Sequence, residues 1–127
     1  MKRCVPDTNT VSQLLKANPA VARRVVAAPK ASLCISVVTK CELLFGFAKR
    51  LQAAVRQFLL RIDVLPFESP EAKHYGAVRA SMEKEGKTLS PLDLMIAAHA
   101  LGAGAVLVTG DKAFKQVPKL KIENWVD

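Results

Sequence analysis

Short, strongly apolar runs alternate with longer stretches of helical periodicity along this chain, and this alternation limits the fold more than any other feature. The runs 33–37 (LCISV) and 105–109 (AVLVT) contain no charged residue. Strands that are apolar on both faces are typical of a parallel sheet covered by helices on both sides. The sequence therefore predicts an α/β fold, with a central parallel sheet flanked by helices on both faces.

The same periodicity places the other elements. Further strands are expected at 2–6, 64–67 and, at an edge of the sheet, 120–122. Helices are expected at 11–16, 20–28, 40–49, 50–62, 70–85, 91–102 and 111–116. Pro29 and Gly86 have the positions of residues that end a helix. The helix at 91–102 is apolar nearly all round, which predicts a central place for it.

The length of 127 residues fits one domain covering residues 1–127. No apolar stretch approaches the roughly 20 residues that a membrane span needs. The start, MKRCVPDTN, lacks the apolar block of a secretory signal. Cys4, Cys34 and Cys41 form no CxxC pair, which favours small buried thiols in a reducing compartment over zinc ligands or disulfides. We therefore expect a cytoplasmic protein with no membrane partner.

The charge of the chain indicates a class of partner. Its formal net charge is +8 and its pI is about 9.7. Positive charge raises the local concentration of polyanions, so nucleic acid is a natural partner. The sequence has no RNP-like aromatic motif, RGG repeat or C2H2 spacing that would specify the mode of binding. Charge alone does not indicate the chemistry.

Four of the eleven acidic residues are expected at one edge of the sheet. Three of them lie just beyond the carboxyl end of a predicted strand, and the fourth lies in the first turn of the apolar helix. In an open α/β sheet, ligands bind outside the carboxyl ends of the strands. The four candidates are Asp7, Glu42, Asp93 and Asp111.

A cluster of four carboxylates is unfavourable without a cation. Two unit charges 4 Å apart repel by about 4 kcal/mol at an effective dielectric constant near 20. Mg²⁺ and Mn²⁺ prefer oxygen ligands and keep several waters, which a substrate phosphate can replace. The pattern therefore predicts metal-assisted hydrolysis of a phosphodiester bond.

Each acid also has a purely structural interpretation. Thr39 and Glu42 have the T-x-x-E spacing of a capping box, and Ser90 and Asp93 have the similar S-x-x-D spacing. The two acids that directly follow strands have the position of helix N-caps. The helix dipole favours acids at these places whatever the function.

Four segments of the chain resemble the motifs of one family. VPDTNTVSQLLK resembles the opening of PIN-domain toxins of the VapC type, and LCISVVTKCELLFG resembles their second motif, in which Glu42 is the acid. TLSPLDLMIAAHAL is similar to their third motif, with Asp93 as the acid. LVTGDKAFKQVPKLKIENW is similar to their closing segment. The resemblance keeps order and spacing over nearly the whole chain.

This resemblance implies a PIN fold and an Mg²⁺- or Mn²⁺-dependent endoribonuclease that cuts RNA, with tRNA or another structured RNA as substrate. It also implies a toxin that forms a homodimer and is neutralised by a VapB-like antitoxin, whose tail enters the acidic pocket. The metal-binding and catalytic roles fall on Asp7, Glu42, Asp93 and Asp111. Thr8, Asn9 or the Thr109 hydroxyl would orient a carboxylate or a bound water.

Two positions depart from the family pattern. Pro6 stands where an aliphatic residue is usual, and Gly110-Asp111 stands where close relatives often carry Asn-Asn. Three alternatives remain open. A haloacid-dehalogenase-like phosphatase would need a second acid at position nine, which is Asn9. The others are a PIN-type nuclease for DNA or rRNA processing, and a basic nucleic-acid-binding module without catalysis.

Several other polar residues have a structural interpretation. His99 lies within an apolar helix and is expected to be a packed core histidine. His74 and Tyr75 are expected on a helix surface. Arg79 is a candidate for contact with a substrate phosphate, and it also fits a solvated helix arginine.

Overall fold

The computed structural model describes residues 2–46 and 51–126. Within them, the strands are β1 Cys4–Pro6, β2 Cys34–Ser36, β3 Asp63–Leu65, β4 Val106–Val108 and β5 Lys121–Glu123. All neighbouring strands pair in parallel, in a sheet of order β1-β4-β5 and a pair β2-β3. A parallel bridge between Cys4 and Leu33 brings β2 beside β1. The strands therefore run in the order β3-β2-β1-β4-β5.

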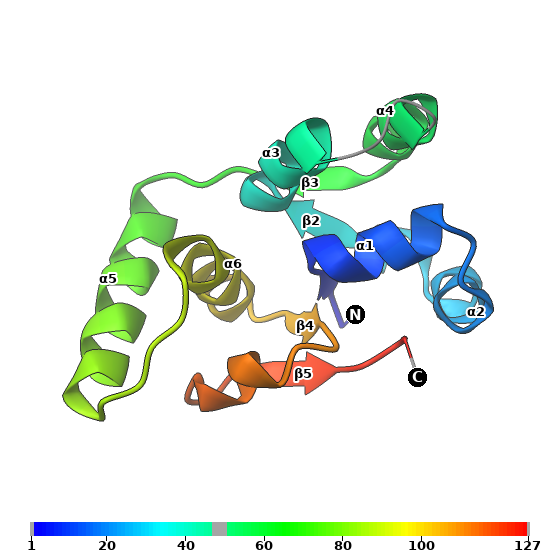
Figure 1. The fold of residues 1–127 in the computed structure, drawn as a ribbon. Coiled ribbons are helices and arrows are strands. Elements are labelled where there is room, and N and C mark those ends of the chain that lie inside the picture. Colours follow the sequence, from blue (N-terminus) through cyan, green and yellow to red (C-terminus); the bar gives the residue numbers. More distant parts are fainter. Residues whose placement is uncertain (1, 47–50, 127) are drawn as a thin grey trace.

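Helices cover both faces of these strands, as predicted. In the described part of the chain the α-helices are α1 Thr8–Leu15, α2 Pro19–Ala27, α3 Val37–Gly46, α4 Gln52–Arg61, α5 Ser69–Lys84 and α6 Pro91–Gly102. Two short 3-10 helices span Lys30–Ser32 and Lys112–Gln116. Figure 1 shows α5 and α6 on one side of the strands and α1 and α2 on the other.

The middle strands β1 and β4 are buried on both faces, which explains their apolar sequence. On one face Leu107 of β4 belongs to the same core cluster as Ile96 of α6. On the other face Val108 belongs to a cluster with Val21 of α2. Because apolar surface is removed from water on both faces, an alternating polar pattern does not appear in these strands.

The prediction of a central helix at 91–102 is confirmed. Ile96, Ala97, Ala98 and Ala100 of α6 are each at most 1% exposed. Figure 1 shows α6 between the strands and α5, so both of its sides are covered. Three alanines on this helix allow its neighbours to approach closely.

Helix α3 begins at Val37, three residues earlier than expected. Ser36, the last residue of β2, accepts a hydrogen bond from the Val38 backbone N–H (3.0 Å) and so takes the capping position. Thr39 is therefore a buried residue inside the helix. The predicted capping box of Thr39 and Glu42 is wrong, and Glu42 lies in the second turn.

Helix α1 also begins three residues early, because Asp7 caps it by accepting from the Thr10 backbone N–H. The other boundaries agree with the predictions to within two residues in the described part of the chain. β3 ends at Leu65, before Pro66, which has no N–H to donate to a neighbouring strand. Gly86 follows the last turn of α5 with φ +69°, as expected for a helix end. Residues 47–50 of the two expected helices lie outside the described residues.

The cysteines agree with the prediction in two of three cases. Cys4 and Cys34 are buried free thiols, and burial raises the pKa of each. Cys41 is exposed, so the prediction of a buried thiol is wrong there, because α3 turns this position outwards. Over residues 2–46 and 51–126, no helix has both the length and the apolar character to cross a membrane.

Candidate active site

One cavity of about 500 Å³ brings the four predicted acids together. It opens beyond the carboxyl ends of β1 and β4, where the sheet topology places them. Two further candidates, Thr8 and Asn9, also face it. The lining residues are Asp7, Thr8, Asn9, Glu42, Asp93, Ile96, Gly110, Asp111, Phe114, Asn124 and Val126.

Asp7 is the most firmly held of the acids. Its Oδ1 accepts from the Thr10 backbone N–H at 2.9 Å, and its Oδ2 accepts from the Thr109 hydroxyl at 2.6 Å. The side chain is only 6% exposed. Asp7 is thus both a helix cap and part of the cavity wall, so the structural and the functional interpretations are compatible.

Thr109 lies behind the cavity and connects two of the acids. Besides donating to Asp7, its hydroxyl oxygen accepts from the Asp111 backbone N–H at 3.0 Å. Asp111 in turn accepts from the Ala113 N–H at 2.9 Å and caps the 3-10 helix that follows β4. The predicted orienting role of Thr109 therefore has a geometric basis.

Glu42 reaches the cavity from α3 and is held by a neighbour on α1. The Thr8 hydroxyl donates a hydrogen bond to Glu42 Oε1 at 2.5 Å. A charge-assisted bond of this kind fixes one carboxylate oxygen and leaves the other available. Asn9 lines the same cavity, and its exposed side chain carries both donors and an acceptor.

The pKa of Asp93 is affected by the charges of the other three acids. Ser90 caps α6 by accepting from the Asp93 backbone N–H at 3.3 Å. Burial raises the pKa of the Asp93 carboxyl, and repulsion from Asp111, Glu42 and Asp7 raises it further, against a lowering by Ser90. The Asp93 carboxyl therefore lies in a shared negative field to which the other three acids contribute.

The donor set fits a hydrated hard cation. Its ligands would be carboxylate oxygens, which Mg²⁺ and Mn²⁺ prefer, and the cavity has room for several waters. Among the described residues, no three His, Cys, Asp or Glu side chains stand close enough to hold one ion directly. Mg²⁺ usually keeps several waters in proteins, and a cavity of this volume fits a hydrated ion.

Arg79 lies outside this cavity. On α5 it pairs with Glu83 (Nε to Oε1, 3.1 Å) and donates to the Tyr75 hydroxyl at 2.8 Å. Its contact with a substrate phosphate stays a prediction. His74 is exposed, as expected, and its ring lies close to Gly102 at the end of α6.

The sequence analysis missed five wall residues of the cavity. Ile96 lies one turn after Asp93 on α6, so helical spacing alone could have placed it there. Asn124 and Val126 come from the segment after β5, and Gly110 and Phe114 follow β4. The place of Asn124 and Val126 depends on the parallel pairing of β4 with β5, which no local pattern indicates.

A family model and several named relatives match this chain. The family model described as PIN domain matches residues 4–120. The tRNA(fMet)-specific endonuclease VapC of Shigella flexneri is 35% identical, over 98% of this chain and 99% of the relative. Ribonuclease VapC2 of Haemophilus influenzae is 32% identical, over 99% and 100% of the two chains.

A solved structure agrees with these matches. The structure of DNA-bound VapBC from Salmonella typhimurium contains a chain with a TM-score of 0.90 and 34% identity to this one. The match covers 98% of this chain and 99% of that chain. Similarity in sequence and in backbone thus extends over the same residues.

Proposed function

Because the chain belongs to the PIN-domain family, we propose that it is a metal-dependent endoribonuclease of the VapC kind and the toxin of a toxin–antitoxin pair. One observation carries the proposal: four carboxylates from different elements meet in one cavity at the carboxyl edge of the sheet. The relatives named as ribonucleases match this chain over nearly its full length. Membership of this family excludes the phosphatase alternative.

PIN-domain nucleases generally use a divalent metal, and we propose Mg²⁺ or Mn²⁺ here. Asp7, Glu42, Asp93 and Asp111 would hold the ion. When bound, such an ion activates a water and stabilises charge on the scissile phosphate. We propose RNA as the substrate, because the chain is strongly basic and its named relatives act on RNA. The proposed location of this activity is the cytoplasm.

The chain's own residues would orient the acids before the substrate arrives. Thr109 holds one oxygen of Asp7, and Thr8 holds one oxygen of Glu42. Such supporting hydrogen bonds fix the direction in which a carboxylate presents its free oxygen. Asn9, which faces the cavity, can donate its amide hydrogens to a phosphate oxygen.

The proposed partner is a small VapB-like antitoxin that binds a homodimer of this chain and extends its tail into the cavity. An Arg or Lys of that tail would occupy the same negative field as the metal. Solved relatives are VapBC assemblies. Co-purification from the native host should return a small protein that inhibits cleavage. A fully active complex would contradict this proposal.

The enzymatic proposal is tested by RNA cleavage with a matched pair of variants. The purified chain should cut RNA with Mg²⁺ or Mn²⁺ and stop in EDTA, leaving 5′-phosphate and 3′-hydroxyl ends. Glu42→Gln should lower the rate by about a hundredfold or more. Glu85→Gln, on the surface and paired with Lys87, should leave it unchanged. Cleavage that survives the chelator, or 2′,3′-cyclic phosphate ends, would contradict the mechanism.

A further inference from the structure

Ser36 and His99 form a buried hydrogen bond between the two helices that carry Glu42 and Asp93. The Ser36 Oγ lies 2.7 Å from the His99 Nδ1. Ser36 is 0% exposed and His99 is 3% exposed. Since Ser36 caps α3 and His99 belongs to α6, the bond joins the start of one acid-bearing helix to the body of the other.

The direction of this hydrogen bond follows from the other partners of the two side chains. Burial lowers the pKa of His99, against opposing effects of Glu71 and of a hydrogen bond to the Pro66 backbone, so the ring is neutral. We assign the ring proton to Nε2, because Pro66 offers only a carbonyl acceptor and no N–H, and this tautomer keeps Nδ1 as an acceptor. The Ser36 hydroxyl therefore donates to Nδ1, while its oxygen accepts from the Val38 N–H.

The His99 ring is also held by its packing. It stands edge-on against Phe67, with ring centroids 5.4 Å apart and an interplanar angle of 85°. Pro66 and Phe67 belong to the connection between β3 and α5. Two parts of the fold, the end of β2 and the connection between β3 and α5, thus contact the ring, and the ring can hold Ser36 in one place.

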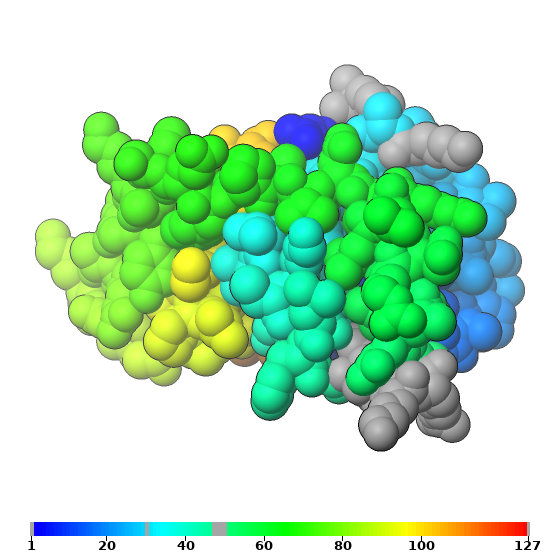
Figure 2. Space-filling model, turned by 90° about the horizontal axis from the view of Figure 1, so that it is seen from above, coloured from blue at the N-terminus to red at the C-terminus, as the bar shows by residue number. Residues whose placement is uncertain are grey.

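A change in helix orientation at this bond would move the acid that each helix carries. Ser36 precedes Glu42 by six residues, and His99 follows Asp93 by six residues. Six helical residues span about 9 Å, so a rotation of about 10° at the bond moves an acid by about 1.5 Å. Functional constellations tolerate only about 0.5 Å of error. Figure 2 shows α3, in teal, beside the start of α6, in yellow, and the two helices pack together.

We propose that Ser36 and His99 are positioning residues whose hydrogen bond sets the separation of Glu42 and Asp93. This inference rests on the proposed function, because the separation matters only if the acids hold an ion. Neither residue is among those that line the cavity in the described structure. Any effect of theirs on metal binding must therefore act through α3 and α6.

The test compares Ser36→Ala and His99→Leu with Val21→Ala, a buried control on α2, which carries no site residue. The Kd for Mn²⁺ is measured by calorimetry without RNA, and kcat and KM are measured for RNA cleavage. Both variants should bind Mn²⁺ about tenfold more weakly and lose kcat, with KM for RNA changed less than about twofold. The control should lose melting temperature alone.

A conservative pair of variants separates positioning from folding. In His99→Asn the side-chain oxygen replaces Nδ1 as the acceptor for Ser36, so Mn²⁺ affinity should return close to the wild-type value. His99→Gln replaces the other ring nitrogen and should stay defective. If His99→Leu does not fold, this pair carries the test.

The outcomes distinguish this inference from the proposed function. A wild-type chain that neither binds Mn²⁺ nor cuts RNA would overturn both. The wild-type chain could bind Mn²⁺ and cut RNA while Ser36→Ala and His99→Leu have the same Mn²⁺ affinity and kcat as Val21→Ala at equal loss of melting temperature. That result would overturn only the positioning role. Equal behaviour of His99→Asn and His99→Gln would overturn it as well. Weakened Mn²⁺ binding restored by His99→Asn would support it.

Discussion

Two buried threonines donate their hydroxyl hydrogens to different kinds of acceptor. The Thr109 hydroxyl donates to the Asp7 carboxylate at 2.6 Å, whereas the Thr10 hydroxyl donates to the Val108 carbonyl at 3.1 Å. Both residues are at most 2% exposed. Replacing either with valine removes one buried hydroxyl and nearly preserves shape. The pair therefore separates loss of stability from loss of carboxylate orientation.

We predict that Thr109→Val and Thr10→Val each lower the free energy of unfolding by about 1–2 kcal/mol. Thr109→Val should also weaken Mn²⁺ binding by about tenfold, because the Asp7 carboxylate loses its supporting donor. Thr10→Val should leave Mn²⁺ affinity unchanged. Urea unfolding and calorimetry measure the two quantities. Equal Mn²⁺ affinity in both variants would show that Thr109 has only a structural role.

The raised pKa of Asp93 predicts how metal-free stability depends on pH. Asp93 ionises in the unfolded chain near its ordinary pKa of about 3.9, but at higher pH in the folded protein. The unfolded state therefore loses its proton first, and wild-type stability falls relative to Asp93→Asn as pH rises from about 4 through the folded pKa.

Glu123 provides a control of opposite sign. Its pKa is lowered, chiefly by the hydrogen bond from Lys2 and then by that from Trp125. Wild-type stability should therefore rise relative to Glu123→Gln as pH rises from the lowered folded pKa to the ordinary value of 4.5, and this contribution is lost as pH falls through the folded pKa. Melting curves in EDTA between pH 3 and 7 test both signs, with about 1 kcal/mol or less expected for each because both groups are partly screened by solvent. If the stability differences between the wild type and Asp93→Asn and between the wild type and Glu123→Gln changed in the same direction with pH, the shared negative field at Asp93 would be contradicted.

At the scale of residues, local patterns placed the acids at one edge, whereas Thr8 and Thr109 were named from the family resemblance alone. The acids were few and each followed a recognisable strand or helix start, so their shared edge followed from topology rules. The hydrogen bond from Thr109 to Asp7 joins residues 102 positions apart. It depends on the register of β1 against β4, which pairs Pro6 with Val108 and cannot be derived from local spacing.

At the scale of elements, α5 and α6 approach each other closely where Gly102 ends α6. A Cβ at Gly102 would lie 2.8 Å from His74 Cδ2 and 3.2 Å from His74 Nε2. An added methyl group therefore requires the exposed His74 ring to move. The small residue at this point permits the contact between the helices.

We predict that Gly102→Ala is nearly neutral alone but stabilising in a His74→Ala background. Alanine is the better helix former by up to about 1 kcal/mol, and only the histidine ring offsets that gain. A double-mutant cycle of urea unfolding free energies measures the coupling. Equal stabilisation in both backgrounds would mean that the ring does not pack against Gly102.

Element boundaries show where sequence reasoning was sufficient. Helix α6 was predicted at its observed bounds, because Ser90-Pro91 marks its start and local chemistry sets that signal. Helix α3 was predicted too late, since Thr39 and Glu42 have the spacing of a capping box, whereas Ser36, correctly placed in β2, takes the capping position. Its capping position is supported by His99, 63 residues away, so no window of local sequence contains the cause.

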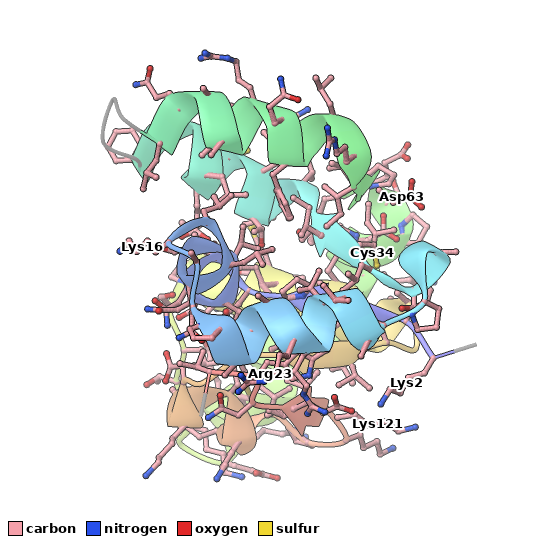
Figure 3. All side chains as sticks on the ribbon, turned by 90° about the vertical axis from the view of Figure 1, so that its right-hand side faces the viewer. Lys2, Lys16, Arg23, Cys34, Asp63 and Lys121 are labelled. Carbon is pink, nitrogen blue, oxygen red and sulfur yellow. The ribbon has the colours of Figure 1, made fainter. Side chains whose placement is uncertain are left out.

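At the scale of the molecule, basic side chains come from several elements. Figure 3 shows Lys2 and Lys16 at opposite ends of the view, with Arg23 on α2 between them and Lys121 on β5. The acidic cavity is thus a local exception in a chain of net charge +8. A polyanion would be attracted to the molecule as a whole, while a cation is attracted to the cavity.

We therefore predict strongly salt-dependent RNA binding. Glu42→Gln, used in EDTA so that RNA stays intact, should bind single-stranded RNA with a logarithmic salt slope of about −0.7 for each phosphate neutralised. A total slope of about −2 or steeper is expected. Filter binding between about 50 and 200 mM salt measures it. Affinity that does not change with salt would contradict attraction by the basic surface.

The fold class followed from the sequence at this scale, but the strand order did not. Apolar runs predicted a parallel sheet covered on both faces, and that prediction is confirmed. The order β3-β2-β1-β4-β5 is set by the crossover connections, each of which can return to either side of an existing strand. That choice depends on the packing of whole helices, which the pattern of one strand does not contain.

The pairing of β1 with β4 also has a consequence for how the protein is made. Asp7 leaves the ribosome before its partners, because its backbone N–H and its carboxylate bind Val108 and Thr109, which are synthesised about a hundred residues later. At translation rates of about 5–20 residues per second, this interval lasts about 5–20 seconds. Contacts between distant residues form only after the intervening chain is available to close the loop. A nascent chain with its first acid exposed therefore still lacks the assembled cavity, and a partner that acts during synthesis would meet the protein before it can cut RNA.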